Sequence, residues 1–493
     1  MSDSKHISTA LDSDAAELKK MGYEQELNRH MSGFSNFAIS FSIICILAGC
    51  ITAFPQALGA GGGASIGIGW LVGASFTVIV SLCMAQIASS YPTAGGLYHW
   101  GSVLGGRGFG WCTAWFNLLG IIFVTASVNF GVYDPMFKTL IAPLLGISPD
   151  SMNYIFQTIF IASITVIQAI MIYRFPKFTT KITDLSGYFI FITAVVLTAS
   201  LLAYSPIKLD FSRLITFTNF TGAEGSIWPR MEGMFLPFIT GLLLSIYTIT
   251  GFDGSAHTAE ETHDAAKTVP KGIINAVVYS AIFGYIMVCT FVLVMPNLEE
   301  GVKQGLGFFD ALMSSLPTGL RTILGITIFI LNFLCGLACL TSCSRMMFAF
   351  ARDGGLPASG FLREIHPTLK TPVAAVWVSG ALAVAATLYG DAFFVLAAGS
   401  AVFLHLSYTM PITAGFLAEG KTWKHKGPFS LGGFSKILAV LAVIGGAFVQ
   451  FIGMKPPNEK VFYLMIAMLL VMAIFWFFLG ENKRFKGPPA VKE

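Results

Sequence analysis

The chain has 493 residues, of which 55% are hydrophobic and only 11% charged, and its mean hydropathy is +0.72. Soluble domains carry about 25% charged residues, so the composition excludes an ordinary soluble protein and indicates an integral membrane protein. The formal net charge of +4 comes from basic residues at the edges of apolar runs, so no nucleic-acid partner is expected.

Apolar runs of about 20 residues predict transmembrane helices along the whole chain. The twelve predicted spans cover residues 34–58, 66–91, 109–133, 153–173, 186–205, 235–255, 272–295, 323–349, 373–389, 392–416, 434–453 and 461–480. With the N-terminus in the cytoplasm, 22 of the 30 Lys and Arg residues fall on the cytoplasmic side. The positive-inside rule therefore predicts an all-α, multi-pass membrane protein with both termini cytoplasmic.

The eight cysteines predict neither a disulfide framework nor a metal centre. They lie mostly within apolar runs, and none is spaced from a histidine as in a zinc site. Packing is the ordinary role of such buried thiols. We therefore expect no bound cofactor.

The predicted sixth span is interrupted by small and polar residues. From Leu236 it reads LPFITGLLLSIYTITGFDGSAHTAEE, with Gly251, Asp253 and Gly254 near its end. A charged residue at mid-bilayer costs roughly 2.5–3.5 kcal/mol, and irregular backbone there is tolerated only where it is buried in protein or lines a cavity. The pattern predicts a helix broken around something polar. The alternative is a helix that ends at Gly251, with Asp253 already at the interface.

The predicted first span has a matching interruption. Small residues gather around Ala48, Gly49 and Cys50, and Pro55 removes a backbone donor. Spans one and six open two successive sets of five, and paired interruptions of this kind indicate a transporter binding site. The free N–H and C=O groups of two broken helices suit the carboxylate and the ammonium of an amino acid. Ordinary packing of small residues between helices is the alternative.

Five strings, in order along the chain, resemble one transporter superfamily. They are GYEQELNRHMSGFSNFAISFS (22–42), MAQIASSYPTAGGLYHW (84–100), WFNLLGIIFVTASVNFG (115–131), YTITGFDGSAHTAEE (247–261) and RMMFAFARDGGLPASGFLREIHPTLKTPVAAVW (345–377). On these strings the chain resembles the amino acid–polyamine–organocation superfamily. Within it, the chain is similar to the amino acid/choline permeases, which include fungal GABA and choline permeases.

The resemblance implies a LeuT-like fold and secondary active transport by alternating access. Such a fold has two inverted repeats of five helices plus two extra helices, with spans one and six discontinuous. The implied regions are a cytoplasmic tail (1–30, with a short amphipathic helix around 14–27), a transport core (31–416, with repeats 31–205 and 235–416), two extra helices (434–480) and a cytoplasmic tail (481–493).

The resemblance also implies a substrate site at the two breaks. The residues expected to contact substrate are Ala48, Gly49, Cys50, Ile51, Thr52, Asn129, Tyr247, Thr250, Gly251 and Phe252. Gly49 replaces a serine of the family pattern, so a hydroxyl is absent there while backbone contacts survive. Tyr247 takes the position of a gating aromatic residue, four residues before Gly251.

Asp253 and His257 are candidates for gating or coupling. Asp253 could hold a gate, take a proton or neutralise a substrate ammonium, and its structural alternative is an N-cap for the second half-helix. His257 follows four residues later on the same helical face and could titrate near neutral pH. We expect a solvated histidine at the membrane interface, which is the more frequent case, and a coupling role for His257 is the alternative.

The coupling ion stays open between H⁺ and Na⁺. In sodium-coupled relatives, hydroxyl groups of the eighth span help to hold the cation, which makes Thr341 and Ser342 a possible sodium site. Proton-coupled relatives place a lysine in the fifth span. Residues 186–205 contain none, and Lys181 precedes that predicted span.

We therefore expect a permease for an amino acid or a related small amine such as GABA, driven by a proton or sodium gradient. Choline and polyamines are the alternatives within the family. A transporter-like sensor is less favoured because the tails are short, and an enzyme is not expected because no intramembrane nucleophile–base pair is evident. The short tails also favour a bacterial inner membrane. The sequence leaves the oligomeric state open.

Overall fold

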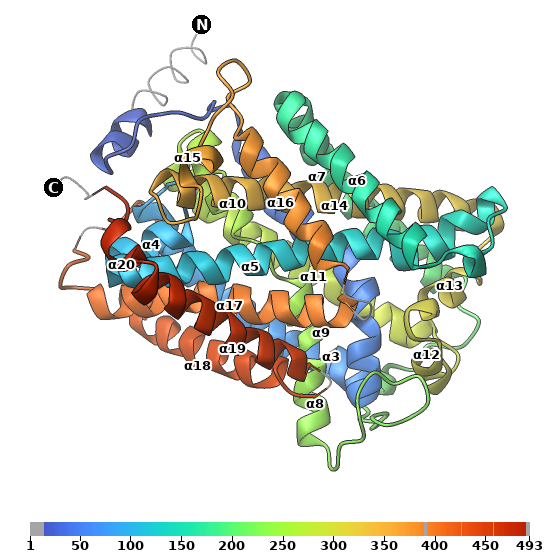
Figure 1. Cartoon of the computed structure of the whole chain (residues 1–493). Helices are drawn as coiled ribbons and strands as arrows, with labels where there is room; N and C mark the ends of the chain where they lie inside the picture. The colour runs from blue at the N-terminus through green and yellow to red at the C-terminus, as the bar shows by residue number, and fades with distance from the viewer. Residues whose placement is uncertain (1–13, 389–391, 425, 457, 490–493) are drawn as a thin grey trace, which may run out of the picture.

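The computed structural model describes residues 14–388, 392–424, 426–456 and 458–489, which form a bundle of helices (Figure 1). The predictions for residues 1–13 and 490–493 lie outside this described part. The α-helices longer than six residues are α2 Gly33–Ile44, α3 Ile46–Ser90, α4 Leu97–Gly105, α5 Arg107–Gly131, α6 Tyr154–Arg174, α7 Pro176–Ala203, α8 Phe235–Gly241, α11 Ala265–Val294, α12 Leu298–Gln304, α14 Thr318–Arg352, α16 Val373–Ala386, α17 Ala392–Ala418, α18 Ser435–Gly453 and α19 Glu459–Ala473, and the π-helix η1 Val132–Ile141 follows α5. The shorter ones that matter here are α9 Leu243–Thr248, α10 Gly254–His257, η5 Ala259–Glu261 and α20 Glu481–Arg484.

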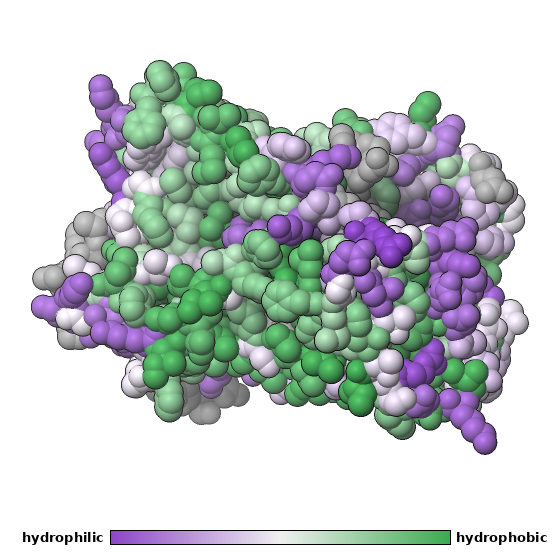
Figure 2. All heavy atoms as spheres, turned by 90° about the horizontal axis from the view of Figure 1, so that it is seen from below, coloured by the Kyte–Doolittle hydropathy of each residue, from purple (hydrophilic) through white to green (hydrophobic). Residues whose placement is uncertain are grey.

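Nine helical segments of the described chain are long and apolar enough to cross a membrane. The first of them, Gly33–Ser90, contains two of the predicted spans, and two shorter apolar helices cover Phe235–Thr248 and Val373–Ala386. The structure thus confirms the predicted all-helical class in its described residues, and the length and composition of these helices suit a membrane. Hydrophobic side chains dominate the broad middle of the face in Figure 2, and hydrophilic ones gather toward its ends. Such an apolar belt suits lipid and would be unusual on a soluble protein.

The first helix break lies three residues before its predicted position. Cys45 has a left-handed backbone (φ 32°) and separates α2 from α3. Ala48 and Gly49 already belong to α3, where their N–H groups both donate to the Cys45 carbonyl. The small residues of the predicted break instead let another helix approach, as shown below. Helix α3 is itself interrupted at Gly61 and Gly62, which join the first two predicted spans through a kink in place of a loop.

The second break falls where the sequence predicts it. Helix α9 ends at Thr248, α10 begins at Gly254, and Gly251 between them has φ 96°. That backbone conformation is available to glycine at little cost and strained for other residues. The second half of this span is short, because α10 has only four residues before the chain passes through η5 to α11.

Two helix pairs dominate the packing of the bundle, α3 with α11 and α5 with α17. Glycines allow these close approaches: a Cβ on Gly120 of α5 would lie 2.7 Å from the Leu404 side chain of α17, and one on Gly284 of α11 would lie 2.5 Å from Trp70 of α3. Small residues of this kind are how helices pack closely in a membrane, where the hydrophobic effect does not drive them together.

The two ends of the described chain meet on one face of the molecule. Residues 14–20 are helical, and the predicted amphipathic helix stops short of residue 27 because Gly22 adopts φ 85°. A Cβ on Gly22 would lie 2.4 Å from Pro489 near the C-terminus. Phe485 also lies against Tyr98 of α4, with ring centroids 6.2 Å apart. Figure 1 shows both ends beside α4 and α20.

Candidate functional site

The two breaks face each other across the centre of the bundle. A Cβ on Gly49 would lie 2.9 Å from the Thr248 Cα, so α3 and the end of α9 are in close backbone contact. A Cβ on Gly251 would lie 2.2 Å from the Ile43 side chain at the end of α2. The free backbone groups of four half-helix ends therefore converge on one small region.

A closed cavity lies in this region, with room for about 20 Å³. That volume holds a single water molecule, so this conformation is closed around the site. None of the lining side chains carries a charge. They are Ile43, Ile44, Ala48, Gly49, Thr52, Val124, Ser127, Val128, Gly131, Tyr247, Thr248, Thr250, Asn332 and Cys335.

Five of the ten residues predicted to contact substrate line this cavity: Ala48, Gly49, Thr52, Tyr247 and Thr250. The hydroxyl of Thr52 donates to the Ala48 carbonyl at 2.8 Å, and the hydroxyls of Tyr247 and Ser127 lie 3.2 Å apart. Tyr247, from the second break, thereby contacts the third predicted span.

The other predicted contacts are buried elsewhere. Cys50 and Ile51 are fully buried in α3 outside the cavity lining. Asn129, which was predicted to contact substrate, lies away from the cavity. Its side-chain amide donates to Thr165 and Gln168 of α6, at 2.9 Å each. Because those partners occupy its donors, Asn129 ties α5 to α6 and does not reach the cavity.

Sequence reasoning missed Asn332 and Cys335, which bring α14 into the cavity wall. The Cys335 thiol lies 3.3 Å from the Ile43 carbonyl, beside the first break. An asparagine inside the eighth span was the available signal, since a polar side chain in a membrane helix needs a protein partner or a cavity.

Asp253 lies at the end of the second break, directly before α10, in a fully buried polar cluster. Its carboxylate accepts hydrogen bonds from the Tyr408 hydroxyl of α17 (2.9 Å) and the Asn117 amide of α5 (2.9 Å), and it lies 3.1 Å from His257 Nε2. Its side chain makes no capping bond to α10. The N-cap alternative is therefore wrong, because the carboxylate turns toward α5 and α17 and away from the helix end.

Gly251 and Phe252 extend the same cluster. The Gly251 N–H donates to the Tyr408 hydroxyl at 3.2 Å, and the Phe252 ring packs 4.8 Å from the Tyr408 ring. Neither residue lines the cavity. The expectation of a solvated His257 is also wrong: the side chain is 0% exposed.

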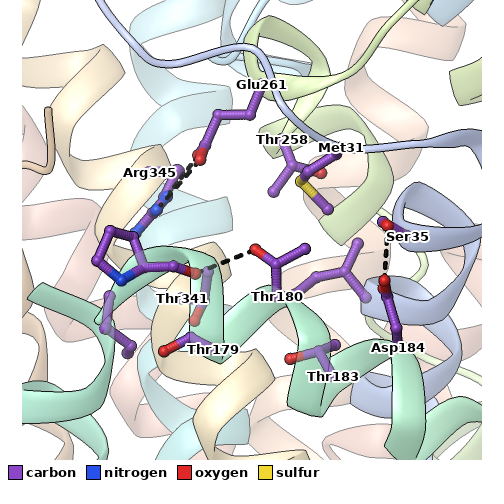
Figure 3. A pocket seen from close by; sticks show the side chains of 13 residues that line it. Met31, Ser35, Thr179, Thr180, Thr183, Asp184, Thr258, Glu261, Thr341 and Arg345 are labelled. Carbon is purple, nitrogen blue, oxygen red and sulfur yellow. Dashed lines mark hydrogen bonds and ion pairs between the residues drawn. The ribbon is translucent and has the colours of Figure 1, made fainter.

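A second small cavity lies between α2, α7 and α14 (Figure 3). Thr341 lines it and donates to the Leu337 carbonyl, whereas Ser342 is outside its lining. Ser35 donates to Asp184 across the cavity at 2.9 Å, and Arg345 pairs with Glu261 at 2.8 Å. In the described residues no group of three or more His, Cys, Asp or Glu side chains could hold a metal ion.

An ionic cluster closes the end of the bundle that holds both ends of the described chain. Arg352 at the end of α14 makes two 3.0 Å hydrogen bonds to Glu260, and Glu260 also accepts from the Ala94 N–H. Asp353 accepts from the hydroxyls of Tyr23 in the N-terminal segment and Tyr98 in α4, at 2.7 and 2.8 Å. The cluster joins four parts of the chain that are far apart in sequence.

Burial acts to raise the pKa of Glu260, but the adjacent Arg352 guanidinium outweighs it and the pKa lies below the usual value. Burial raises the pKa of Asp353, although Arg352 and the two tyrosine hydroxyls oppose that shift. The Glu260–Arg352 pair is therefore charged near neutral pH.

Comparison with known proteins places these features in a family. The sequence pattern of the family described as "Amino acid permease" matches residues 31–478. The chain is 32% identical to "Amino-acid permease BAT1" of Arabidopsis thaliana, over 97% of this chain and 96% of that protein. It is similarly 32% identical to the "Amino-acid permease BAT1 homolog" of Oryza sativa subsp. japonica, over 97% and 96%. It is 27% identical to the "GABA-specific permease" of Saccharomyces cerevisiae, over 90% of this chain and 78% of that protein.

Proposed function

Because the chain belongs to the amino acid permease family, we propose that it carries a small zwitterionic amino acid across the membrane by alternating access between its two faces. Family membership makes it a multi-pass membrane transporter of amino acids and excludes an enzyme. The substrate, the coupling ion and the mechanism are the parts that we propose.

The observation that carries this proposal is the closed cavity between the breaks at Cys45 and Gly251. The start of α3 offers N–H groups for a carboxylate, and the ends of α2 and α9 offer carbonyls for an ammonium. In its closed form the cavity is too small for an amino acid, so substrate entry requires the half-helices to move apart. Such movement of broken helices is the basis of alternating access.

The uncharged lining supports a substrate without net charge, such as GABA or an α-amino acid. A charge buried without a partner is strongly unfavourable. A dicationic polyamine would therefore need carboxylates that this lining lacks, and choline, with one positive charge, would need one. Asp253, the carboxylate beside the breaks, is already engaged by three partners.

We further propose the twelve-span arrangement of two inverted repeats plus two helices, with both termini cytoplasmic. The nine long apolar helices and two shorter ones support it, as does the contact between Gly22 and Pro489 at the two ends. The relatives described above come from plants and a fungus, so they lend no support to the predicted bacterial inner membrane.

The proposal is tested with purified protein in liposomes. Counterflow of labelled alanine, GABA, choline and putrescine is measured with equal ion concentrations on both sides, so the result does not depend on the coupling ion. We expect exchange of an amino acid or GABA and none of putrescine. Exchange of putrescine or choline alone would contradict the zwitterion proposal. Binding without any exchange would favour a sensor.

A further inference from the structure

His257 is a buried histidine whose two ring nitrogens both face hydrogen-bond acceptors. Nε2 lies 3.1 Å from Asp253 Oδ2, and Nδ1 lies 3.3 Å from the Ala94 carbonyl. Gly96 lets this segment approach, since a Cβ there would lie 3.4 Å from Nδ1, and its φ of 45° suits glycine. The ring thus bridges the second helix break and the segment that follows α3.

The arrangement fits a protonated ring better than a neutral one. A neutral imidazole has one N–H donor, whereas an imidazolium has two. Two acceptors at hydrogen-bonding distance are both satisfied only when both nitrogens carry hydrogen. Tyr408 and Asn117 also donate to Asp253, and these two hydrogen bonds favour an ionised carboxylate as the partner of an imidazolium.

We propose that His257 is the site that binds the transported proton, held by Asp253 and the Ala94 carbonyl. This inference rests on the proposed transport function. Loss of the proton leaves one N–H for two acceptors, so the ring must release either the break or the segment around Ala94. The Ala94 N–H is bonded to Glu260 of the cytoplasmic cluster. Proton release therefore weakens the closure on the cytoplasmic side.

Asp253 is the charged group that the His257 ring contacts directly. From α17, Tyr408 bonds to Asp253, and His405 lies against the Tyr408 ring at 5.4 Å. The charged groups of η5 and α14 are engaged with each other, as the pairs Glu260–Arg352 and Glu261–Arg345.

The test compares His257→Gln with wild type in liposomes, using the labelled amino acid or GABA that the wild type exchanges. Glutamine can still donate to Asp253 but cannot take up a proton. The matched control is His405→Asn, a second fully buried histidine, whose Nδ1 faces only a carbonyl of its own helix. Two quantities are measured: counterflow at equal pH, and accumulation driven by an acid exterior without sodium.

We expect His257→Gln to keep counterflow within about twofold and to lose proton-driven accumulation by roughly 5- to 150-fold, the usual range of a coupling free energy. The control should keep both. Proton-driven accumulation by His257→Gln at the wild-type level would overturn the inference.

A measurement on the wild type covers the case in which the variant does not fold. A pH-sensitive dye trapped in the liposomes should report a proton entering with each substrate molecule. Accumulation driven by sodium at uniform pH, with no dye response, would overturn the proton site and leave the transport function intact. Absence of counterflow by the wild type would overturn the transport function itself, and this inference with it.

Discussion

Gly49 is the residue that allows α3 to touch the end of α9. A Cβ here would lie 2.9 Å from the Thr248 backbone and 2.8 Å from its side chain, both too close for a real contact. Overpacking of this kind costs about 1–3 kcal/mol. We expect Gly49→Ala to lower uptake roughly 5- to 150-fold, with normal amounts of protein in the membrane.

Gly325→Ala is the matched control for that experiment. It also adds one methyl group to a glycine in a membrane helix, α14, but its nearest neighbour would lie 3.8 Å away. Uptake should remain at the wild-type level. If Gly49→Ala also transports normally, Gly49 fills space and the breaks do not need this close approach.

Asp253 joins α5, α10 and α17 through one carboxylate. Asparagine at this position keeps the size but turns an acceptor into a donor that faces other donors, and it removes the partner charge of His257. Losing a hydrogen bond to a charged group costs about 1.5–3 kcal/mol. We expect Asp253→Asn to lose both counterflow and gradient-driven uptake while expression holds.

That outcome would separate Asp253 from His257, whose glutamine variant should keep counterflow. Full activity of Asp253→Asn in both assays would rule out any role of its charge.

At the scale of elements, we propose that the N-terminal segment acts as a latch on the proposed cytoplasmic side. Tyr23 bonds to Asp353, and its ring lies 4.0 Å from the Arg352 guanidinium. Tyr23→Phe keeps the ring but removes a hydrogen bond to a carboxylate. We expect the cytoplasmic side to open more often, which would raise maleimide labelling of Cys335 by about tenfold or more.

Peptide-resolved mass spectrometry of inside-out vesicles measures this labelling. Tyr204→Phe is the control, since Tyr204 is exposed, follows the C-terminal end of α7 and takes no part in the cluster around Arg352. Unchanged labelling in Tyr23→Phe would mean that the latch does not limit opening.

The same labelling has a predicted dependence on pH. The pKa of Glu260 is lowered, so its contribution is fully present above its usual pKa and is lost only as the pH falls through the lowered value. Between about pH 6 and 8 the Glu260–Arg352 pair therefore stays intact. We expect labelling of Cys335, relative to the more accessible Cys112, to rise with pH in wild type, because the proposed proton site bridges the second break and the segment around Ala94.

In His257→Gln this ratio should be flat over the same range. A rise in the variant equal to that in wild type would place the pH sensor outside His257.

At the scale of the whole molecule, both termini should lie in the cytoplasm. The two ends of the described chain contact each other, and the basic residues gather on the same side. Fluorescent tags on the N- and C-terminus should therefore both be cleaved by protease in inside-out vesicles and both be protected in intact cells. Protection of one tag alone in either preparation would contradict an even number of spans.

Much of the architecture could be predicted from the sequence because lipid imposes simple rules. Long apolar runs must form helices whose backbone groups are satisfied internally, so the all-helical membrane class and the break at Gly251 were evident from the sequence pattern. Gly251 was identifiable because a carboxylate rarely stands beside a glycine inside an apolar run unless the helix is interrupted there.

The rest was decided by tertiary contacts, which no local pattern encodes. The first break moved to Cys45 because the small residues at 48–50 serve the approach of α9 and leave the helix intact. Asn129 was predicted to lie in the site but bonds to α6, whereas Asn332 was not predicted and lines the cavity. A polar side chain in a membrane helix bonds to whichever partner the fold provides. His257 and Asp253 could be placed on one helical face from sequence. Their partners Ala94, Asn117 and Tyr408 come from three other segments, and only the folded bundle brings them together.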